Sequence, residues 1–334
     1  MTSLKNPTPI ATVFGGSGFL GRYVTQRLAR AGWRVRVAVR RPNEALFVRT
    51  YGVVGQVEPV QANVRDEEST RRAIEGADAV INCVGILVET GKQLFDAVQG
   101  EGAARVARIA REEGVGRLVQ ISAIGADAES DSDYARSKAA GEAAVAEAFP
   151  GAVILRPSIM FGTDDDFFNR FGAMARLSPV LPLVGAKTRF QPVYVDDVAA
   201  AAVKAATEEV APGIYELGGP EVESFHGLMQ RMLRLIERRR ILVSLPFRVA
   251  RFQGAMLDLV QRWSFGLFTN TLLTSDQVRL LARDNVVAPD ARGFEALGIV
   301  PTAMEAVLED YLYAYRPHGQ FDAITASARN LREG

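Results

Sequence analysis

Residues 10–41 read IATVFGGSGFLGRYVTQRLARAGWRVRVAVRR, and this stretch decides the predicted fold. An apolar run over 10–14 leads into a glycine-rich turn, GGSGFLG (15–21), and a helical pattern then extends to Gly32. Missing side chains in such a turn let the backbone approach a pyrophosphate, which binds the free N–H groups at the helix start. Strand, turn, helix and second strand occur in the required order, so the stretch predicts a dinucleotide-binding motif. The alternative is a glycine-rich turn that binds nothing.

The end of the second predicted strand indicates which nucleotide is bound. An acidic residue about 20 residues past the glycines is typical of NAD, whereas arginine there suits a 2′-phosphate. This chain has Arg40 and Arg41, and the next carboxylate is Glu44. We therefore predict NADP(H) as the cofactor, with Arg40 on the 2′-phosphate. The alternative for Arg41 is a solvated residue that ends the strand.

Composition excludes several classes of site. The 334 residues carry 39 basic and 39 acidic side chains, so no overall field attracts nucleic acid. Cys83 is the single cysteine, and the two histidines, His226 and His318, lie far apart, which argues against a disulfide or metal site. No apolar run approaches the ~20 residues that span a bilayer. The start, MTSLKNPTP, lacks the core of a signal or transit peptide, which predicts a soluble cytoplasmic protein.

Alternating strand and helix patterns continue through the first half of the chain. Strand-like runs lie at Val57–Ala62, Ala79–Val84, Leu118–Ser122 and Ala152–Leu155. Helical stretches lie at Glu67–Glu75, Phe95–Glu113 and Tyr134–Ala148. This order predicts an α/β fold, a Rossmann-type doubly wound parallel sheet whose ligand lies at the carboxyl ends of the strands. Those ends carry Asn63, Val64, Val84, Gly85, Ser122 and Pro157.

Tyr134 and Lys138 form the one constellation that suggests catalysis. They are four residues apart, so both leave the same face of one helix. A lysine ammonium beside a phenol lowers the pKa of the phenol, and Ser122 could bind a substrate oxygen. The three side chains could relay a proton beside a nicotinamide. The alternative is that Tyr134 and Lys138 only hold the nicotinamide ribose.

Several of these segments together resemble the extended short-chain dehydrogenase/reductase superfamily over residues 8–220. They are GGSGFLG (15–21), NVRD (63–66), NCVG (82–85), YARSK (134–138), RPS (156–158) and PVYVDDV (192–198). Three further runs are similar to one branch, the nucleotide-binding accessory subunit of respiratory complex I and its alphaproteobacterial relatives. They are AFPGAVILRPSIMFGTDDDFFNRF (148–171), LPLVGAKTRFQPVYVDDVA (181–199) and LLTSDQVRLLARDNVV (272–287).

This resemblance implies a structural role for the nucleotide. It implies an NADPH-binding subunit on the peripheral arm of complex I, beside the junction with the membrane, on the cytoplasmic side of a bacterial inner membrane. Its partners are other peripheral-arm subunits, and neither a small-molecule substrate nor turnover of its own is expected. The nucleotide site is expected to comprise Gly15, Ser17, Gly18, Phe19, Leu20, Gly21, Arg40, Arg41, Asn63, Val64, Val84, Gly85, Ser122, Tyr134, Lys138 and Pro157.

The sequence departs from active relatives between Ser122 and Tyr134. That short segment carries the carboxylates Asp127, Glu129, Asp131 and Asp133. Such a cluster would repel a diphosphate substrate and oppose a phenolate, unless it is an ordinary solvated loop. The rival functions stay open: a free NADP-dependent reductase or sugar-nucleotide epimerase that uses Ser122, Tyr134 and Lys138, or a redox-sensing regulator.

The region after residue 220 carries a second signal. Residues 231–262 contain eight arginines against Glu237 and Asp258, and a helical pattern over 247–263 separates apolar from basic positions. Residues 245–268 are therefore a candidate for contact with a membrane surface or a partner, the alternative being a helix that covers its own core.

We divide the chain into three parts. Residues 1–160 are the expected NADP(H)-binding domain. Residues 161–316 are a smaller, mainly helical C-terminal part that is interleaved with the sheet. Within it, Thr302 and Glu305 are spaced as a capping box for a last helix. Residues 317–334 are a tail without a strong pattern, either a disordered end or an arm that a partner would order.

Overall fold

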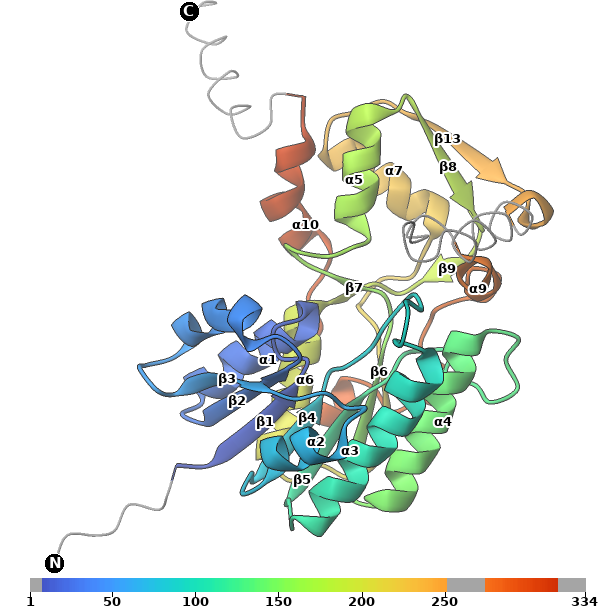
Figure 1. Ribbon diagram of the computed structural model, residues 1–334. Helices are drawn as coiled ribbons and strands as arrows, with labels where there is room; N and C mark the ends of the chain where they lie inside the picture. Colours follow the sequence, from blue (N-terminus) through green and yellow to red (C-terminus); the bar gives the residue numbers. More distant parts are fainter. Residues whose placement is uncertain (1–7, 251–273, 318–334) are drawn as a thin grey trace, which may run out of the picture.

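Seven parallel strands form the main sheet, in the order β11-β6-β5-β4-β1-β2-β3 (Figure 1). The structure is a computed structural model that describes residues 8–250 and 274–317. The strands are β1 Ile10–Phe14, β2 Arg34–Val39, β3 Val57–Gln61, β4 Ala79–Asn82, β5 Arg117–Ile121, β6 Val153–Pro157 and β11 Gly213–Leu217. Every strand expected in the first half of the chain is present, and the doubly wound fold class is confirmed.

Helices cover both faces of this sheet. Two of them, α1 Phe19–Arg30 and α6 Val195–Thr207, pack on one face, where Val24 and Val198 are fully buried. The other face carries α2 Glu67–Ile74, α3 Glu101–Glu112 and α4 Asp133–Ala148. The alanine-rich sequence of α6 lets its backbone lie close to α1. The predicted helices are confirmed, except that the Phe95–Glu113 stretch begins as a π-helical turn, η2 Asp96–Gly100. A 3-10 helix, η1 Pro42–Tyr51, joins β2 to β3.

A smaller part of the molecule sits at the carboxyl-end edge of the sheet (Figure 1). Its helices are α5 Phe168–Leu177, α7 Phe225–Leu235 and α10 Glu305–Leu312, with the 3-10 turn η4 Tyr313–Tyr315. Its strands are the short β7 Met160–Phe161, β9 Arg189–Phe190, β10 Val193–Tyr194 and β12 Glu223–Ser224, and the parallel pair β8 Val180–Val184 and β13 Ile241–Leu245. Phe168, Leu181, Met229 and Leu308 are fully buried in a separate apolar core.

The chain after residue 160 contributes to both parts. Helix α6 and strand β11 return to the main sheet, and Phe294 and Leu297, in and beside the 3-10 turn η3 Glu295–Leu297, complete the core next to them. Between β11 and η3 in the sequence, α9 Ser275–Leu280 contacts α4. None of the described helices is long and apolar enough to cross a membrane.

The C-terminal region departs from one prediction and agrees in part with another. The predicted capping box is wrong, because Thr302 donates through its backbone N and its Oγ1 to Asp197 (2.6 and 3.0 Å) instead of capping α10. Residues 247–250 are helical as expected. The rest of the predicted 247–263 helix, and the tail beyond Pro317, lie outside the described residues.

Candidate nucleotide-binding site

A cavity of about 580 Å³ lies at the carboxyl ends of β1, β2, β3 and β4. Nine of the predicted site residues line it: Gly15, Ser17, Gly18, Arg40, Arg41, Asn63, Val64, Val84 and Gly85. The other lining residues were not among the predicted site residues; they are Phe14, Ala38, Val39, Glu44, Ala62, Arg65, Cys83, Ile86, Gln93 and Val98. Five of these, Phe14, Ala38, Val39, Ala62 and Cys83, are apolar or small residues at strand ends, and only their place in the sheet reveals that they face the cavity.

The glycine turn has the geometry that a pyrophosphate needs. Gly15 has a φ of +71°, and its carbonyl accepts a hydrogen bond from the amide of Gly18 at 2.9 Å. A Cβ on Gly21 would collide with the carbonyl oxygen of Gly15, so Gly21 allows α1 to pack against the turn. The N-cap, Gly18, provides no side-chain cap and the first turn of α1 has no acidic residue. The free N–H groups and the positive helix end are therefore left for an anion.

Three arginines approach the end of the cavity beside β2 and β3. Arg41 pairs with Glu44 at 3.0 Å on the surface, whereas Arg40 makes no hydrogen bond or ion pair within the described part of the chain. Arg65 donates through Nη1 to the carbonyl of Lys92 at 2.8 Å, and its buried Nε has no partner among the described residues. Arg40 and Arg65 are thus the cations that an anionic group in this part of the cavity would meet.

The far end of the cavity adjoins a buried polar cluster formed by Gln99 of η2, Lys138 of α4 and Ser122, which follows β5. A Cβ on Gly85 would lie 3.4 Å from Lys138 Nζ and 3.5 Å from Gln99 Oε1, so both atoms approach the backbone of Gly85. Within the described residues Gln99 Oε1 and Ser122 Oγ are buried without a hydrogen-bond partner, and Lys138 Nζ reaches only the carbonyl of Ile121 at 3.4 Å. Buried polar atoms without partners are costly, so this cluster suits a ligand that carries hydroxyl groups.

The Tyr134 phenol does not have the lowered pKa that a proton relay needs. Its ring packs edge-on against Phe95 with centroids 5.7 Å apart, and Lys138 Nζ lies over the ring, 5.8 Å from its centroid. Burial, helped by the charge of Asp276, raises the pKa of Tyr134 to about 12. Burial also lowers the pKa of Lys138 to about 8, although Glu142 and Cys83 act in the opposite direction. The expected lowering of the Tyr134 pKa by Lys138 is therefore wrong in this structure.

The acidic segment before Tyr134 is held by the C-terminal region. Arg283 pairs with Asp127 (3.0 Å) and Asp131 (3.7 Å), and Arg279 lies 3.9 Å from Asp133. Arg279 also donates to the carbonyl of Asp131 at 3.0 Å. The carboxylates Glu129, Asp131 and Asp133 are exposed, as in a solvated loop, but arginines on and beside α9 pair with three carboxylates of the segment and offset part of its charge.

The remaining predicted site residues lie outside the cavity lining. Leu20 and Gly21 are buried on the sheet side of α1, and Phe19 packs edge-on against Tyr23. Pro157 ends β6, where its carbonyl accepts a hydrogen bond from Ile124 at 3.1 Å. Ser122 and Lys138 belong to the polar cluster, and Tyr134 lies beside it on helix α4. In residues 8–250 and 274–317 no group of three or more His, Cys, Asp or Glu side chains could hold a metal ion.

Comparison with known proteins agrees with this geometry. Residues 11–218 match the family model described as the NAD dependent epimerase/dehydratase family. Subunit 9 of the mitochondrial NADH dehydrogenase [ubiquinone] 1 alpha subcomplex from Arabidopsis thaliana is 37% identical over 96% of this chain and 81% of its own length. The Mus musculus subunit of the same name is 34% identical over 92% of this chain and 81% of its own. A ceramide reductase from Caulobacter vibrioides is 32% identical over 78% of this chain and 80% of its own.

Solved structures share the fold at low sequence identity. The NADPH-dependent quinone oxidoreductase of Escherichia coli, complexed with NADPH, superposes with a TM-score of 0.68 at 17% identity, over 90% of this chain and 98% of the other. The triphenylmethane reductase of Citrobacter sp. gives a TM-score of 0.69 at 19% identity, over 91% and 99%. The family model matches more than half of the residues of this chain, so the chain belongs to the NAD dependent epimerase/dehydratase family.

Proposed function

We propose that this protein is an NADPH-binding accessory subunit of respiratory complex I, of the type found in alphaproteobacteria. The observation that carries the proposal is its likeness to the subunit 9 proteins of NADH dehydrogenase [ubiquinone], which extends over nearly the whole chain, including the C-terminal part. The family model alone ends at residue 218 and would fit a free enzyme equally well.

The proposed role of the nucleotide is to stabilise the fold. A ligand that binds only the native state adds RT ln(1 + [L]/Kd) to the free energy of unfolding. The cavity joins β1, β2, β3 and β4 to the helix start of α1, so a bound dinucleotide would tie these elements together. Arg40 is assigned to the 2′-phosphate, the glycine turn to the pyrophosphate, and Tyr134 and Lys138 to the nicotinamide ribose. The raised pKa of Tyr134 supports a holding role over proton transfer.

The proposed partners are other subunits of the peripheral arm near the membrane junction, on the cytoplasmic side of the inner membrane. Residues 245–268 are the proposed contact with those subunits or with the membrane surface. Their basic and aromatic composition supports this proposal.

A second candidate, a free NADP-dependent reductase, is favoured by one specific observation. The Caulobacter relative is named a ceramide reductase and is 32% identical over 264 residues. Ser122, Tyr134 and Lys138 would then be the catalytic residues of this chain. Binding of substrate would have to lower the pKa of the Tyr134 phenol from about 12.

Mild solubilisation of membranes followed by native electrophoresis tests the proposal. We expect the protein to comigrate with NADH:quinone oxidoreductase activity, and a soluble monomer or dimer would refute the assignment. Tyr134→Phe separates the two candidates, since it removes only the hydroxyl group. A structural subunit should still assemble with unchanged complex activity, whereas a reductase should lose turnover with NADPH.

A further inference from the structure

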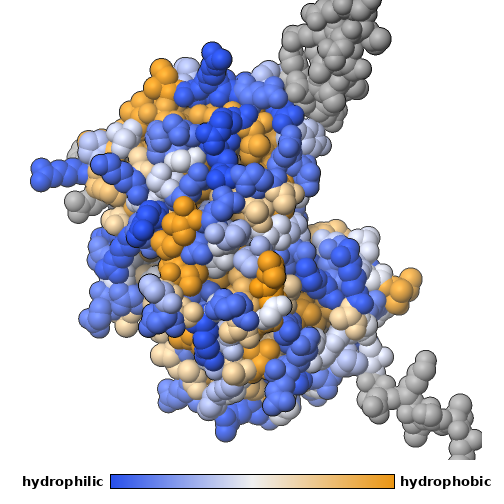
Figure 2. All heavy atoms as spheres, turned by 180° about the vertical axis from the view of Figure 1, so that it is seen from behind, coloured by the Kyte–Doolittle hydropathy of each residue, from blue (hydrophilic) through white to orange (hydrophobic). Residues whose placement is uncertain are grey.

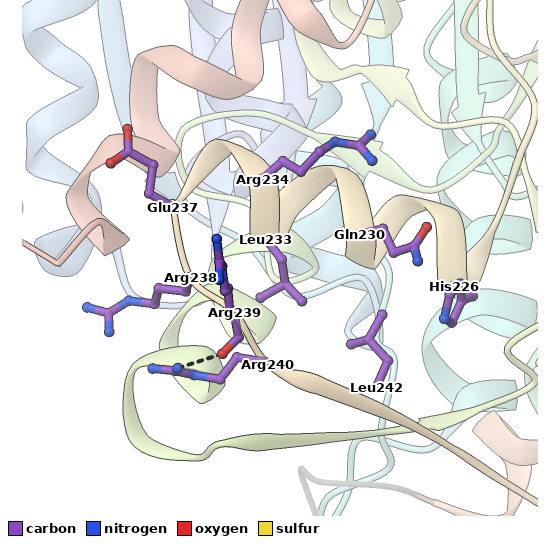
Figure 3. Close-up of a pocket in the computed structure, with 9 residues that line it drawn as sticks. All are labelled: His226, Gln230, Leu233, Arg234, Glu237, Arg238, Arg239, Arg240 and Leu242. Atoms are coloured by element: carbon purple, nitrogen blue, oxygen red, sulfur yellow. Dashed lines mark hydrogen bonds between the residues drawn. The ribbon is translucent and has the colours of Figure 1, made fainter.

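A second cavity, of about 720 Å³, lies between α7 and β13, away from the nucleotide site. We call it the arginine groove: His226, Gln230, Leu233, Arg234, Glu237, Arg238, Arg239, Arg240 and Leu242 line it. Figure 3 shows Arg238, Arg239 and Arg240 following one another on the turn from α7 to β13, with Arg234 one helical turn back. Four arginine residues therefore line one concave site.

The positive charge of the arginine groove is not balanced by nearby carboxylates. Glu237 is its one acidic lining residue, and that side chain is directed to Arg316, 3.6 Å from Nε. Burial and the charges of Arg240 and Arg176 lower the pKa of Arg238, as is expected where cations crowd together. An anion in the groove would relieve this repulsion.

The four arginines divide into two fixed and two exposed side chains. Arg238 donates through Nε to the carbonyl of Tyr315 at 2.7 Å, and Arg240 donates through Nε to that of Ala175 at 2.7 Å. The side chains of Arg234 and Arg239 are exposed and make no hydrogen bond or ion pair within residues 8–250 and 274–317. The groove thus combines positioned cations with two whose donors are available to a ligand.

An exposed aliphatic surface lies next to the groove on the same strand. In the parallel register of β8 and β13, Ile241 pairs with Val180 and Val243 with Pro182, and all four project from the outer face of the ribbon. Ile241 is 64% exposed, and Leu177, three residues before Val180, is 90% exposed. Figure 2 shows hydrophobic patches directly beside hydrophilic ones at this end of the molecule, toward the upper left of that view.

We propose that the arginine groove binds the phosphate headgroup of an anionic phospholipid, while the outer face of the β8–β13 ribbon contacts the lipid surface. Guanidinium groups match phosphate oxygens in charge and geometry, and exposed aliphatic side chains next to arginines are typical of a membrane-facing surface. Apart from the imidazole of His226, the lining residues include no aromatic ring on which a nucleic-acid base could stack, which disfavours single-stranded nucleic acid. This proposal stands on the groove and does not depend on assembly with complex I.

The test uses the full-length purified protein and vesicles of phosphatidylcholine with or without cardiolipin. We expect cosedimentation only with cardiolipin, and Arg234→Gln combined with Arg239→Gln should weaken it about 30-fold, because each basic residue near an anionic surface contributes about 1 kcal/mol. Neither side chain supports the fold through a described bond, so the variant should fold normally. The matched control is Arg30→Gln with Arg49→Gln, which removes the same charge from exposed positions elsewhere and should leave binding nearly unchanged.

Two further arms separate the lipid from other anions. Ile241→Ser with Val243→Ser should weaken vesicle binding without altering the fold. If it has no effect and inorganic phosphate competes fully for the site, the groove binds a soluble phosphate and the lipid proposal is overturned. Equal losses in both arginine double variants, or no binding of the wild-type protein to any vesicle, would also overturn it. In the latter case an acidic protein surface would be the alternative occupant.

Discussion

Asp276 accepts a hydrogen bond from the backbone amide of Tyr134 at 3.3 Å, although 142 residues separate the two in the sequence. The same carboxylate accepts bonds from Ser132 Oγ and from the amide of Asp133, both at 2.8 Å. A side chain of the C-terminal region thus caps the helix that carries Tyr134 and Lys138. The start of α9 and the start of α4 form one hydrogen-bonded unit, so a substitution in either should affect the stability of the other.

Asp276→Asn should loosen this unit. The variant removes the negative charge from the N-terminus of α4, where a cap and its interaction with the helix dipole contribute about 1 kcal/mol. The free energy of unfolding, measured with urea, should fall by that amount. Ultraviolet titration should also show a lower pKa for Tyr134, which stays above its ordinary value of 10.0 because burial is the larger cause. Asp290→Asn, at an exposed position, is the control and should change neither quantity.

Local sequence patterns were sufficient to predict six of the seven strands of the main sheet and nine of the nineteen residues that line the nucleotide cavity. The glycine turn, the strand ends and Arg40 are read from short segments, because each depends on neighbours within a few residues. The position of Asp276 could not be read in this way, since the contact joins α9 to α4 across 142 residues. The pairing of Arg283 with Asp127 was missed for the same reason.

The prediction for Tyr134 failed on energetics. The spacing placed Lys138 on the correct face of α4, but the effect of its charge depends on burial and on neighbouring carboxylates. The prediction of a capping box at Thr302 failed for a different reason. Its motif is present, but a tertiary contact with Asp197 replaces the local cap. For Thr302 the partner was missed, whereas for Tyr134 the neighbouring Lys138 was found and the effect of burial was missed.

Gly21→Ala should disrupt the nucleotide turn. The added Cβ would meet the carbonyl oxygen of Gly15, which belongs to a turn that cannot move without displacing α1 or β1. Overpacking of this kind costs about 1–3 kcal/mol, so thermal unfolding should shift down and binding of NADPH should weaken. Gly100→Ala is the matched control, because its Cβ would have open space. If both variants bind NADPH equally well, the assigned packing role of Gly21 is incorrect.

Arg40→Ala should change nucleotide selectivity. Loss of an arginine that binds a 2′-phosphate should weaken NADPH by about 1.5–3 kcal/mol, which is at least tenfold, and leave NADH nearly unchanged. Arg41→Ala should have the smaller effect, because Arg41 already pairs with Glu44. Isothermal titration of each variant with both nucleotides measures the difference. Equal weakening of NADPH and NADH by Arg40→Ala would assign Arg40 to another part of the nucleotide, and Arg65 would then be the next cation to test.

Lys138→Met should alter how stability depends on pH in the nucleotide-free protein. Burial lowers the pKa of Lys138 to about 8 from an ordinary value of 10.5, so between these values the unfolded chain binds more protons than the folded one. The free energy of unfolding of the wild-type protein should therefore gain a contribution that grows as pH rises from about 8 to 10.5, on the order of 1–3 kcal/mol. Lys138→Met lacks this contribution, so its stability advantage at low pH should shrink over the same window. Urea unfolding across that window measures the difference, with the exposed Lys187→Met as control. Parallel stability curves for the wild-type protein and Lys138→Met would show that the Lys138 ammonium is not destabilised by burial.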